Sequence, residues 1–289
     1  MATTDPNAAA NEQIRDQQRD VWNTFSAGWK KQDDFVVEWL RPVGTTLIEQ
    51  AALRDGDVAL DAATGTGEPG LSAAARVGSG KVVGVDISEQ MVVIAAEKAR
   101  QKGISNYEAR VTDESALPFA DASFDAVLCR FGVMFFPDPP RGVRELARVL
   151  KPGRRLALAA WAEPQKNAWA TTASRVVNEL LALPAPPPDA PGIFRHAAPG
   201  LLSSLLDQAG LHDAEVTEVT GEATFESPEA YWVFITDVVA PVATALKNID
   251  APQREAVKQA VLAAAAASAS PGSTEIRLPW SALVASATK

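Results

Sequence analysis

Short apolar runs rich in β-branched residues alternate with helical patterns through the middle of this 289-residue chain. Residues 58–62, 81–86 and 124–130 have the composition of strands. The segments between them carry apolar residues at the three- and four-residue spacings of helices. Strands that alternate with helices predict βαβ units and a mostly parallel sheet with right-handed crossovers. We therefore expect an α/β protein.

The pattern divides the chain into three parts. Residues 1–50 carry apolar side chains at helical spacing, and we expect two helices there that form an N-terminal lid. Residues 51–161 hold the alternating strands and helices and should form the core of the sheet. Residues 162–289 combine helical segments with a proline-rich connector at 184–192, and we expect a helical cap and two more strands that complete the sheet. The last strand, at 274–289, alternates as an antiparallel strand does.

Composition excludes several classes of protein. Acidic residues outnumber basic ones by 36 to 27, so we expect no nucleic-acid partner and no stable membrane association. Cys129 is the single cysteine and there are two histidines, so we expect neither a disulfide framework nor a metal centre. The sequence has no run of about 18 apolar residues and no leader pattern, which predicts a cytoplasmic protein. Without a heptad seam, we expect a monomer or a homodimer.

A glycine-rich loop follows the first strand. Gly65, Gly67 and Gly70 satisfy the G-x-G-x-x-G pattern at a strand-to-helix junction, where backbone N–H groups can approach a cofactor. The acids Asp61 and Glu68 flank this loop, and they would repel a pyrophosphate and attract a cation. The charge pattern therefore favours S-adenosylmethionine, which carries an ammonium and a sulfonium. An NAD(P)-dependent oxidoreductase that uses the same loop is the alternative.

Two further acids follow at the ends of the next strands. Asp86 closes the second strand, where a carboxylate can accept hydrogen bonds from both ribose hydroxyls. Asp113 lies in the loop before 124–130, where a carboxylate can accept from the adenine amino group. NAD sites also place an acid at the second strand, so the third acid is the feature that favours the adenosylmethionine cofactor.

Four segments together resemble the class I S-adenosylmethionine-dependent methyltransferases, specifically the type 11-like small-molecule group that includes the ubiquinone/menaquinone C-methyltransferases. They are VALDAATGTGEPG, VVGVDIS, VTDESALPFADASFDAVLCRFGVMFFPDP and ELARVLKPGRRLALAAW, in the family's order and spacing. The resemblance implies a Rossmann-like three-layer sandwich with a seven-stranded sheet of order 3-2-1-4-5-7-6. Strand 7 of that sheet is antiparallel, as expected above from the last residues. The cofactor-binding core would be residues 51–161.

The resemblance also implies which residues bind the cofactor. They are Asp61, Gly65, Thr66 and Gly67 around the methionine part, Asp86 at the ribose, Ile87, Asp113 and Glu114 at the adenine, and Arg130 near the methionine amine. Ala63 stands where many relatives have the first glycine of the loop, so the turn is bulkier there.

Aromatic residues gather where the acceptor should bind. In this fold the acceptor arrives over the carboxyl ends of the central strands, and the predicted pocket residues are Trp22, Trp29, Phe131, Phe135 and Trp161. They favour methyl transfer by in-line displacement to a small, apolar or aromatic acceptor, with S-adenosylhomocysteine as the product.

His196 follows the proline-rich connector and is the candidate general base for a hydroxyl acceptor. The other interpretation is a histidine that caps a loop. A catalytically silent protein that only binds the cofactor is a further alternative to the enzyme.

Overall fold

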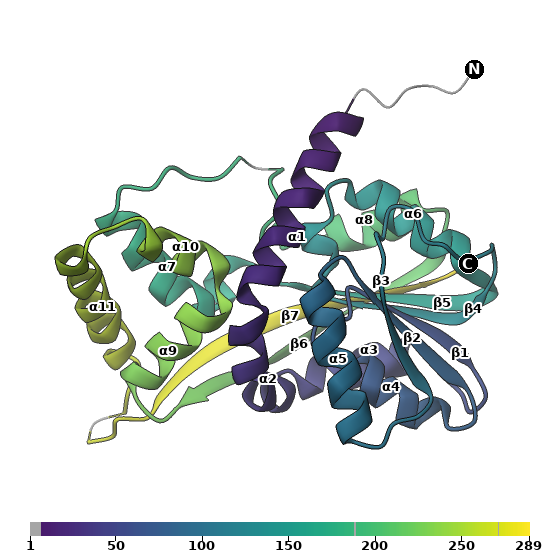
Figure 1. Ribbon diagram of the computed structural model, residues 1–289, viewed down its shortest axis with the longest axis horizontal. Helices are drawn as coiled ribbons and strands as arrows, with labels where there is room; N and C mark the ends of the chain where they lie inside the picture. Colours follow the sequence, from purple (N-terminus) through teal and green to yellow (C-terminus); the bar gives the residue numbers. More distant parts are fainter. Residues whose placement is uncertain (1–6, 188, 271) are drawn as a thin grey trace.

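The computed structural model describes residues 7–187, 189–270 and 272–289. Residues 1–6 of the expected lid and Pro188 of the expected proline-rich connector lie outside this part of the chain. Within it, helices cover both faces of one central sheet, and a group of helices lies to one side (Figure 1).

The described residues form seven strands, and their order in the sheet is 3-2-1-4-5-7-6, as the resemblance implied. The first five strands are parallel, whereas the last is antiparallel to both of its neighbours, which confirms the expectation for the C-terminal residues. The strands are β1 (Val58–Ala62), β2 (Lys81–Asp86), β3 (Tyr107–Val111), β4 (Phe124–Arg130), β5 (Leu150–Trp161), β6 (His212–Phe225) and β7 (Ile276–Thr288).

Helices pack on both faces of the sheet because its central strands are apolar on both faces. The helices of the described ranges are α1 (Ala8–Lys31), α2 (Asp33–Trp39), α3 (Arg41–Gln50), α4 (Gly70–Val77), α5 (Glu89–Gln101), α6 (Pro139–Val149), α7 (Ala168–Leu180), α8 (Leu201–Gln208), α9 (Pro228–Val238), α10 (Ala240–Lys247) and α11 (Ala251–Ala266), with the short 3₁₀ turns η1 (Val133–Phe135) and η2 (Pro164–Lys166). Helices α3, α4 and α5 cover one face, and α6 and α8 cover the other (Figure 1).

The N-terminal segment contains three helices rather than the expected two. The chain turns at Gln32 and again at Leu40, where the backbone leaves helical geometry, and Pro42 lies in the first turn of α3. Proline has no N–H to continue a preceding helix, so a new helix begins there. At Gly28, α1 crosses α9 so closely that an added Cβ would lie 2.1 Å from the carbonyl oxygen of Asp237.

Helices α7, α9, α10 and α11 form a helical lobe beside the sheet, carried by the long strands β6 and β7 (Figure 1). Two of its helices begin at side-chain caps. Ser227 accepts a hydrogen bond from the N–H of Ala230, and Asp250 forms a capping box with Gln253. No single helix in the described ranges is long and apolar enough to cross a membrane, although α9 and α10, bent by 90°, meet the length and composition criteria together.

Candidate functional site

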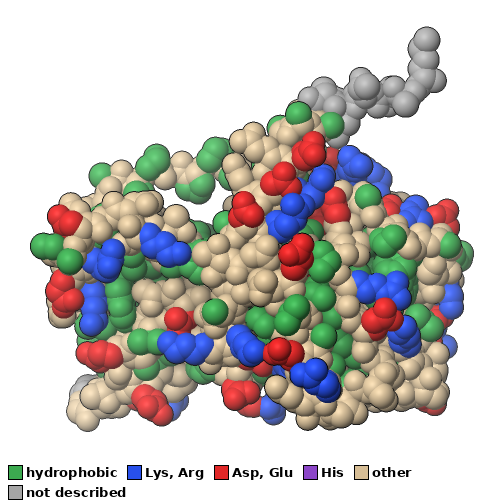
Figure 2. Space-filling model, in the orientation of Figure 1, with side chains coloured by type: hydrophobic (Ala, Val, Ile, Leu, Met, Phe, Trp, Pro, Cys, Tyr) green, Lys and Arg blue, Asp and Glu red, His purple; other side chains and the backbone are tan. Residues whose placement is uncertain are grey.

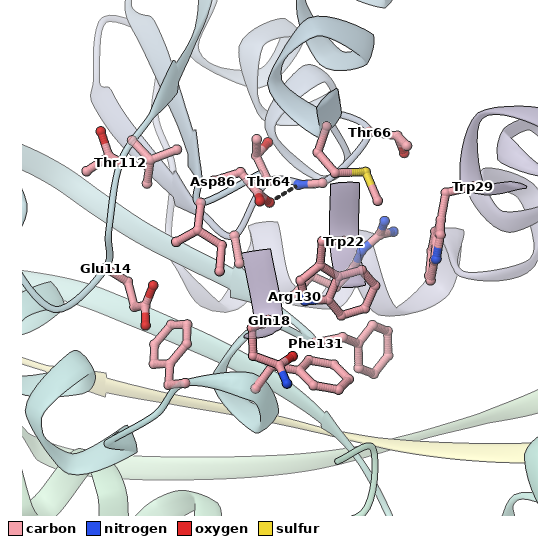
Figure 3. A pocket seen from close by; sticks show the side chains of 18 of the residues that line it. Gln18, Trp22, Trp29, Thr64, Thr66, Asp86, Thr112, Glu114, Arg130 and Phe131 are labelled. Carbon is pink, nitrogen blue, oxygen red and sulfur yellow. Dashed lines mark hydrogen bonds between the residues drawn. The ribbon is translucent and has the colours of Figure 1, made fainter. Parts of the chain in front are cut away.

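A cavity of about 110 Å³ lies at the carboxyl ends of β1, β2 and β4, under α1 (Figure 3). In the sheet, β1 has β2 on one side and β4 on the other, so the strand order reverses at this point. Ligands of open α/β sheets bind in the crevice at such a switch point. The cavity therefore lies where the sheet topology predicts a ligand.

The glycine loop after β1 forms one wall of the cavity. Thr64, Gly65 and Thr66 line it, whereas Gly67 lies behind, because a Cβ on Gly67 would be 2.8 Å from the Cδ1 atom of Leu71. Gly65 has a φ of +53°, and a Cβ there would meet no atom within 4 Å. Gly65 is therefore required by the backbone conformation and Gly67 also by close packing.

Asp86 is held at the end of β2 with both carboxylate oxygens fixed. Its Oδ2 accepts a hydrogen bond from the N–H of Gly65 and its Oδ1 from the N–H of Ser88, each at 2.9 Å. Burial raises the pKa of Asp86, and these N–H groups oppose that effect. Each carboxylate oxygen can accept a second hydrogen bond. Asp86 lines the cavity, so its chemistry fits the two hydroxyls of a ribose.

Asp61 lies beneath the glycine loop and does not line the cavity. Its Oδ2 accepts hydrogen bonds from the Thr64 hydroxyl at 2.5 Å and from the N–H of Gly70 at 2.9 Å. Its Oδ1 is buried without a hydrogen-bond partner among the described residues. Burial raises the pKa of Asp61 to about 7, while Thr64 and Arg130 act to lower it. An unpartnered buried carboxylate oxygen suits a nearby cationic group.

The loop after β3 places one of its two expected residues in the cavity. Thr112 and Glu114 line the cavity, and Asp113 does not. Asp113 instead forms an ion pair with Arg15 of α1, with 2.7 Å between the Arg15 Nε and the Asp113 Oδ2, and its Oδ1 accepts a hydrogen bond from the N–H of Ser115 at 2.8 Å. The structure therefore places Asp113 outside the cavity lining, beside a cation from α1, and its contact with the adenine edge stays a prediction.

Glu114 is the acid that faces the cavity at this end. Its carboxyl is buried, and burial together with the neighbouring charge of Asp113 raises its pKa to about 7. Ile87, expected at the adenine face, lines the cavity beside Met91 of α5. This end of the cavity therefore combines apolar side chains with a carboxyl that can carry a proton near neutral pH.

Aromatic side chains form the opposite wall. Trp22 and Trp29 come from α1, and Phe131 and Phe135 follow β4; all four line the cavity as expected (Figure 3). Trp22 contacts Phe135 edge to face, with 5.0 Å between ring centroids. Trp161, the fifth expected residue, does not line the cavity because it lies beneath Phe131, stacked on it with 4.3 Å between centroids.

Phe131 has an unusual backbone conformation. Its φ is +61°, in the left-handed region where bulky side chains are rare. Its N–H donates to the carbonyl of Ala159 at 2.9 Å, so the chain is fixed immediately after the end of β4. Strained residues that the surrounding structure holds in place are concentrated at functional sites. Here the strain directs a phenyl ring into the wall of the cavity.

Arg130 is the sole cationic side chain that lines the cavity within the described part of the chain. Its guanidinium has no hydrogen bond and no ion pair there, and the carboxylates of Glu68 and Asp61 act on it only at longer range. Burial lowers the pKa of Arg130. The cavity thus has one free guanidinium and the three lining acids Glu68, Asp86 and Glu114, a balance that favours a cationic ligand carrying one anionic group.

His196, the candidate base, does not line the cavity. It is buried in the turn that follows the proline-rich connector, and its Nε2 has no hydrogen-bond partner among the described residues. Burial and the nearby charge of Arg195 lower the pKa of His196 to about 4. His196 is therefore neutral at pH 7, but the structure places it outside the site.

Sequence reasoning missed lining residues that include Gln18 and Met91. Gln18 precedes Trp22 by four residues and Trp29 by eleven, so all three lie on one face of α1. That spacing would have indicated Gln18 once the two tryptophans were assigned to the pocket. Met91 carries no comparable signal, because its sequence spacing gives no reason to separate it from the core.

The site combines the sheet order, the glycine loop, a carboxylate at Asp86 that suits a ribose, and an excess of negative charge. Together these features define a Rossmann-like protein that binds a cationic nucleoside cofactor. A family model described as a methyltransferase domain matches residues 59–153. The nocamycin O-methyltransferase of Saccharothrix syringae is 33% identical over 204 residues, which are 67% of this chain and 72% of that protein.

Two further proteins show the same relationship. The ubiquinone/menaquinone biosynthesis C-methyltransferase UbiE of Cronobacter sakazakii is 30% identical over 230 residues, 73% of this chain and 89% of the relative. The crystal structure of a SAM-dependent methyltransferase from Aquifex aeolicus matches with a TM-score of 0.52 and 26% sequence identity. The match covers 67% of this chain and 92% of the Aquifex chain. The chain belongs to the class I S-adenosylmethionine-dependent methyltransferases, and S-adenosyl-L-methionine is its cofactor.

Proposed function

We propose that this methyltransferase acts on a small, apolar or aromatic acceptor. The observation that carries the proposal is the wall of Trp22, Trp29, Phe131 and Phe135, which faces the glycine loop and Asp86 across one cavity. The bound cofactor supplies an activated methyl group, transferred by in-line displacement with S-adenosylhomocysteine as the product. Aromatic faces stabilise a cation such as a sulfonium and pack against flat apolar molecules.

The cofactor would lie along the carboxyl edge of the sheet. Thr112 and Glu114 at β3 mark one end, Asp86 at β2 the middle, and Arg130 at β4 the other end. Three strand spacings separate β3 from β4, about 14 Å, which suits an extended nucleoside with an amino-acid tail. With its ribose at Asp86 and its adenine beside Glu114, the cofactor would place its methionine part over the glycine loop and Arg130.

The charge of Arg130 revises one expected contact. A guanidinium repels an ammonium, so Arg130 is unsuited to the methionine amine and suited to the methionine carboxylate, which it can bind through two N–H groups. The amine would then lie toward Glu68 and the buried Oδ1 of Asp61, which act as its counter-charges. Each charged group of the cofactor would thereby face a group of opposite sign.

Residues 7–50 act as a lid in this proposal. Three contacts fasten α1 over the site: Arg15 to Asp113, Asn23 to Ser88, and Lys30 to Glu97. Ligand pockets usually measure about 300–1,000 Å³, far more than the cavity beneath α1. The lid must therefore move to admit cofactor and acceptor, and its tryptophans then exclude water from the reacting atoms.

The chain's own contribution to the chemical step is positioning. Phe131, fixed by its backbone bond and by Trp161, orients the acceptor, and α1 closes the site to solvent. His196 lies outside the cavity lining, so we propose no proton transfer through it. On the face drawn in Figure 2, Lys and Arg are interspersed with Asp and Glu, which supports a small acceptor rather than a nucleic acid.

Calorimetric titration and an acceptor screen test the proposal. The protein is titrated separately with S-adenosylhomocysteine and with NADH, and is then incubated with S-adenosylmethionine and matched acceptor pairs that share a methylatable group on an aromatic or a polar frame. We expect binding of S-adenosylhomocysteine alone and turnover with the aromatic member of each pair. Turnover confined to polar acceptors would refute the acceptor class, and binding without any turnover would favour the silent cofactor-binding protein.

A further inference from the structure

A buried chain of hydrogen bonds connects β3 to the floor of the site. The hydroxyl of Tyr107, the first residue of β3, lies 2.9 Å from the hydroxyl of Thr64. Thr64 in turn donates to the Oδ2 of Asp61 at 2.5 Å. The Thr64 hydroxyl has one proton, and it uses that proton in the hydrogen bond to Asp61. The Tyr107 hydroxyl must therefore be the donor to the Thr64 oxygen. The direction of the chain is therefore from Tyr107 through Thr64 to Asp61.

Two glycines make room for this chain. A Cβ added to Gly84 of β2 would lie 2.2 Å from the Tyr107 hydroxyl and 2.9 Å from the Thr64 Oγ1. A Cβ added to Gly70 would lie 2.8 Å from the Tyr107 ring and 2.6 Å from the Asp61 Oδ2. Any larger residue at either position would displace the phenol or the carboxylate. The phenol reaches Thr64 only because both positions lack side chains.

Asp61 has several charged or titratable neighbours. Arg130 favours its ionised form, whereas Glu68 of the loop disfavours it. The Cys129 thiol of β4 and the Tyr107 phenol also face it, and burial and the charge of Asp61 raise the pKa of both, so both stay protonated at neutral pH. Asp86 of β2 acts on Tyr107 in the same direction. The hydrogen bonds that Thr64 and Gly70 donate to Asp61 stabilise its ionised form, and they oppose the cost of burying its charge.

We propose that Tyr107 is a positioning residue for the cofactor: through Thr64 it holds Asp61 ionised, with Oδ1 turned away from the chain and free for a cation. This inference rests on the proposed assignment of Asp61 to the cationic methionine part. A donor that is itself a hydrogen-bond acceptor is polarised and binds a carboxylate more strongly. Without the phenol hydroxyl, Thr64 becomes a weaker donor and Asp61 takes up a proton more readily.

The sign of the effect follows from the charge of the ligand. The ionised form of Asp61 attracts the methionine amine, and the protonated form does not. The pKa of Asp61 is about 7, so affinity for S-adenosylhomocysteine should weaken as the pH falls below about 7. Removal of the phenol hydroxyl raises that pKa, and the weakening should then begin at a higher pH.

The test is titration of Tyr107→Phe with S-adenosylhomocysteine by calorimetry from pH 6.5 to 8.5. A rise of one unit in the pKa of Asp61 corresponds to roughly eightfold weaker binding at pH 6.5 and roughly fivefold at pH 7, shrinking to roughly 1.3-fold at pH 8.5. Taking the ratio to the unchanged protein at each pH cancels the titration of the ligand.

Tyr231→Phe is the matched control. Tyr231 is also buried, and its hydroxyl donates to the carbonyl of Trp169 at 2.9 Å in the helical lobe, away from the cavity. This variant should leave the pH profile unchanged. Equal weakening of Tyr107→Phe at every pH would show a structural defect only and overturn the inference, as would an unchanged profile. If the unchanged protein binds no S-adenosylhomocysteine at any pH, the proposed cofactor site itself is refuted.

Discussion

Replacement of Arg130 by methionine tests the proposed orientation of the cofactor. The guanidinium lines the cavity and has no intramolecular hydrogen bond or ion pair within the described residues, so its truncation removes no such contact from the free protein. A hydrogen bond to a charged group contributes about 1.5–3 kcal/mol. Loss of the methionine carboxylate contact should therefore weaken S-adenosylhomocysteine binding by roughly 10- to 150-fold.

A second ligand isolates this contact. 5′-Methylthioadenosine has the adenine, the ribose and the thioether but lacks the amino-acid part, so Arg130→Met should change its affinity by less than about threefold. Calorimetry with both ligands on both proteins gives the coupling between the guanidinium and the amino-acid part. Arg130→Lys keeps the charge without the two parallel N–H groups and should lie between the two proteins.

The control variant is Arg155→Met. Arg155 of β5 donates to Glu215 and to Ser286, outside the cavity lining. Its removal should leave both affinities unchanged. If Arg130→Met weakens both ligands equally, the guanidinium acts on the nucleoside or on the fold, and the proposed orientation is wrong. If it weakens neither ligand but raises the KM of the acceptor, the anionic group that Arg130 binds belongs to the acceptor.

Four further predictions concern single residues. Asp86→Ala should weaken S-adenosylhomocysteine binding by about 1.5–3 kcal/mol, and unchanged affinity in calorimetry would refute its assignment to the ribose. Ala63→Gly should raise the free energy of unfolding by about 0.5–1 kcal/mol, because Ala63 has a φ of +54°; a lower Tm would contradict this. Gly28→Val should force α1 away from α9, lower stability by about 1–3 kcal/mol and expose α1 to limited proteolysis, whereas unchanged cleavage would contradict the close approach. His196→Gln should retain turnover and lose less stability than the unchanged protein as the pH falls from 6.5 to 4, because the folded-state pKa of His196 is lowered to about 4; loss of turnover with unchanged stability would restore His196 as the base.

Local signals explain how much of the fold and of the site the sequence predicts. Strand composition, the glycine loop and the alternation of the last residues each act over a few neighbouring positions, and they predict the parallel strands, the antiparallel last strand and the placement of Asp86 at the carboxyl edge, whereas the sheet order followed from the resemblance to the family. The position of Asp113 depends instead on Arg15, a residue almost one hundred positions earlier. A single sequence contains no local signal for such a pair, so it does not show that Glu114 lines the cavity and Asp113 does not.

The end of β4 shows why two adjacent residues can serve two ligands. In an extended strand, Arg130 and Phe131 would point to opposite faces of the sheet, yet both line the cavity. The left-handed conformation of Phe131 makes this possible, at a cost of about 1–2 kcal/mol. Stacking of its ring on Trp161 contributes about 0.5–1.5 kcal/mol, and the N–H bond to Ala159 adds a fixed point. The strain is therefore largely offset inside the fold, and the turn brings the cation that we propose binds the cofactor and the ring that we propose binds the acceptor to the same cavity.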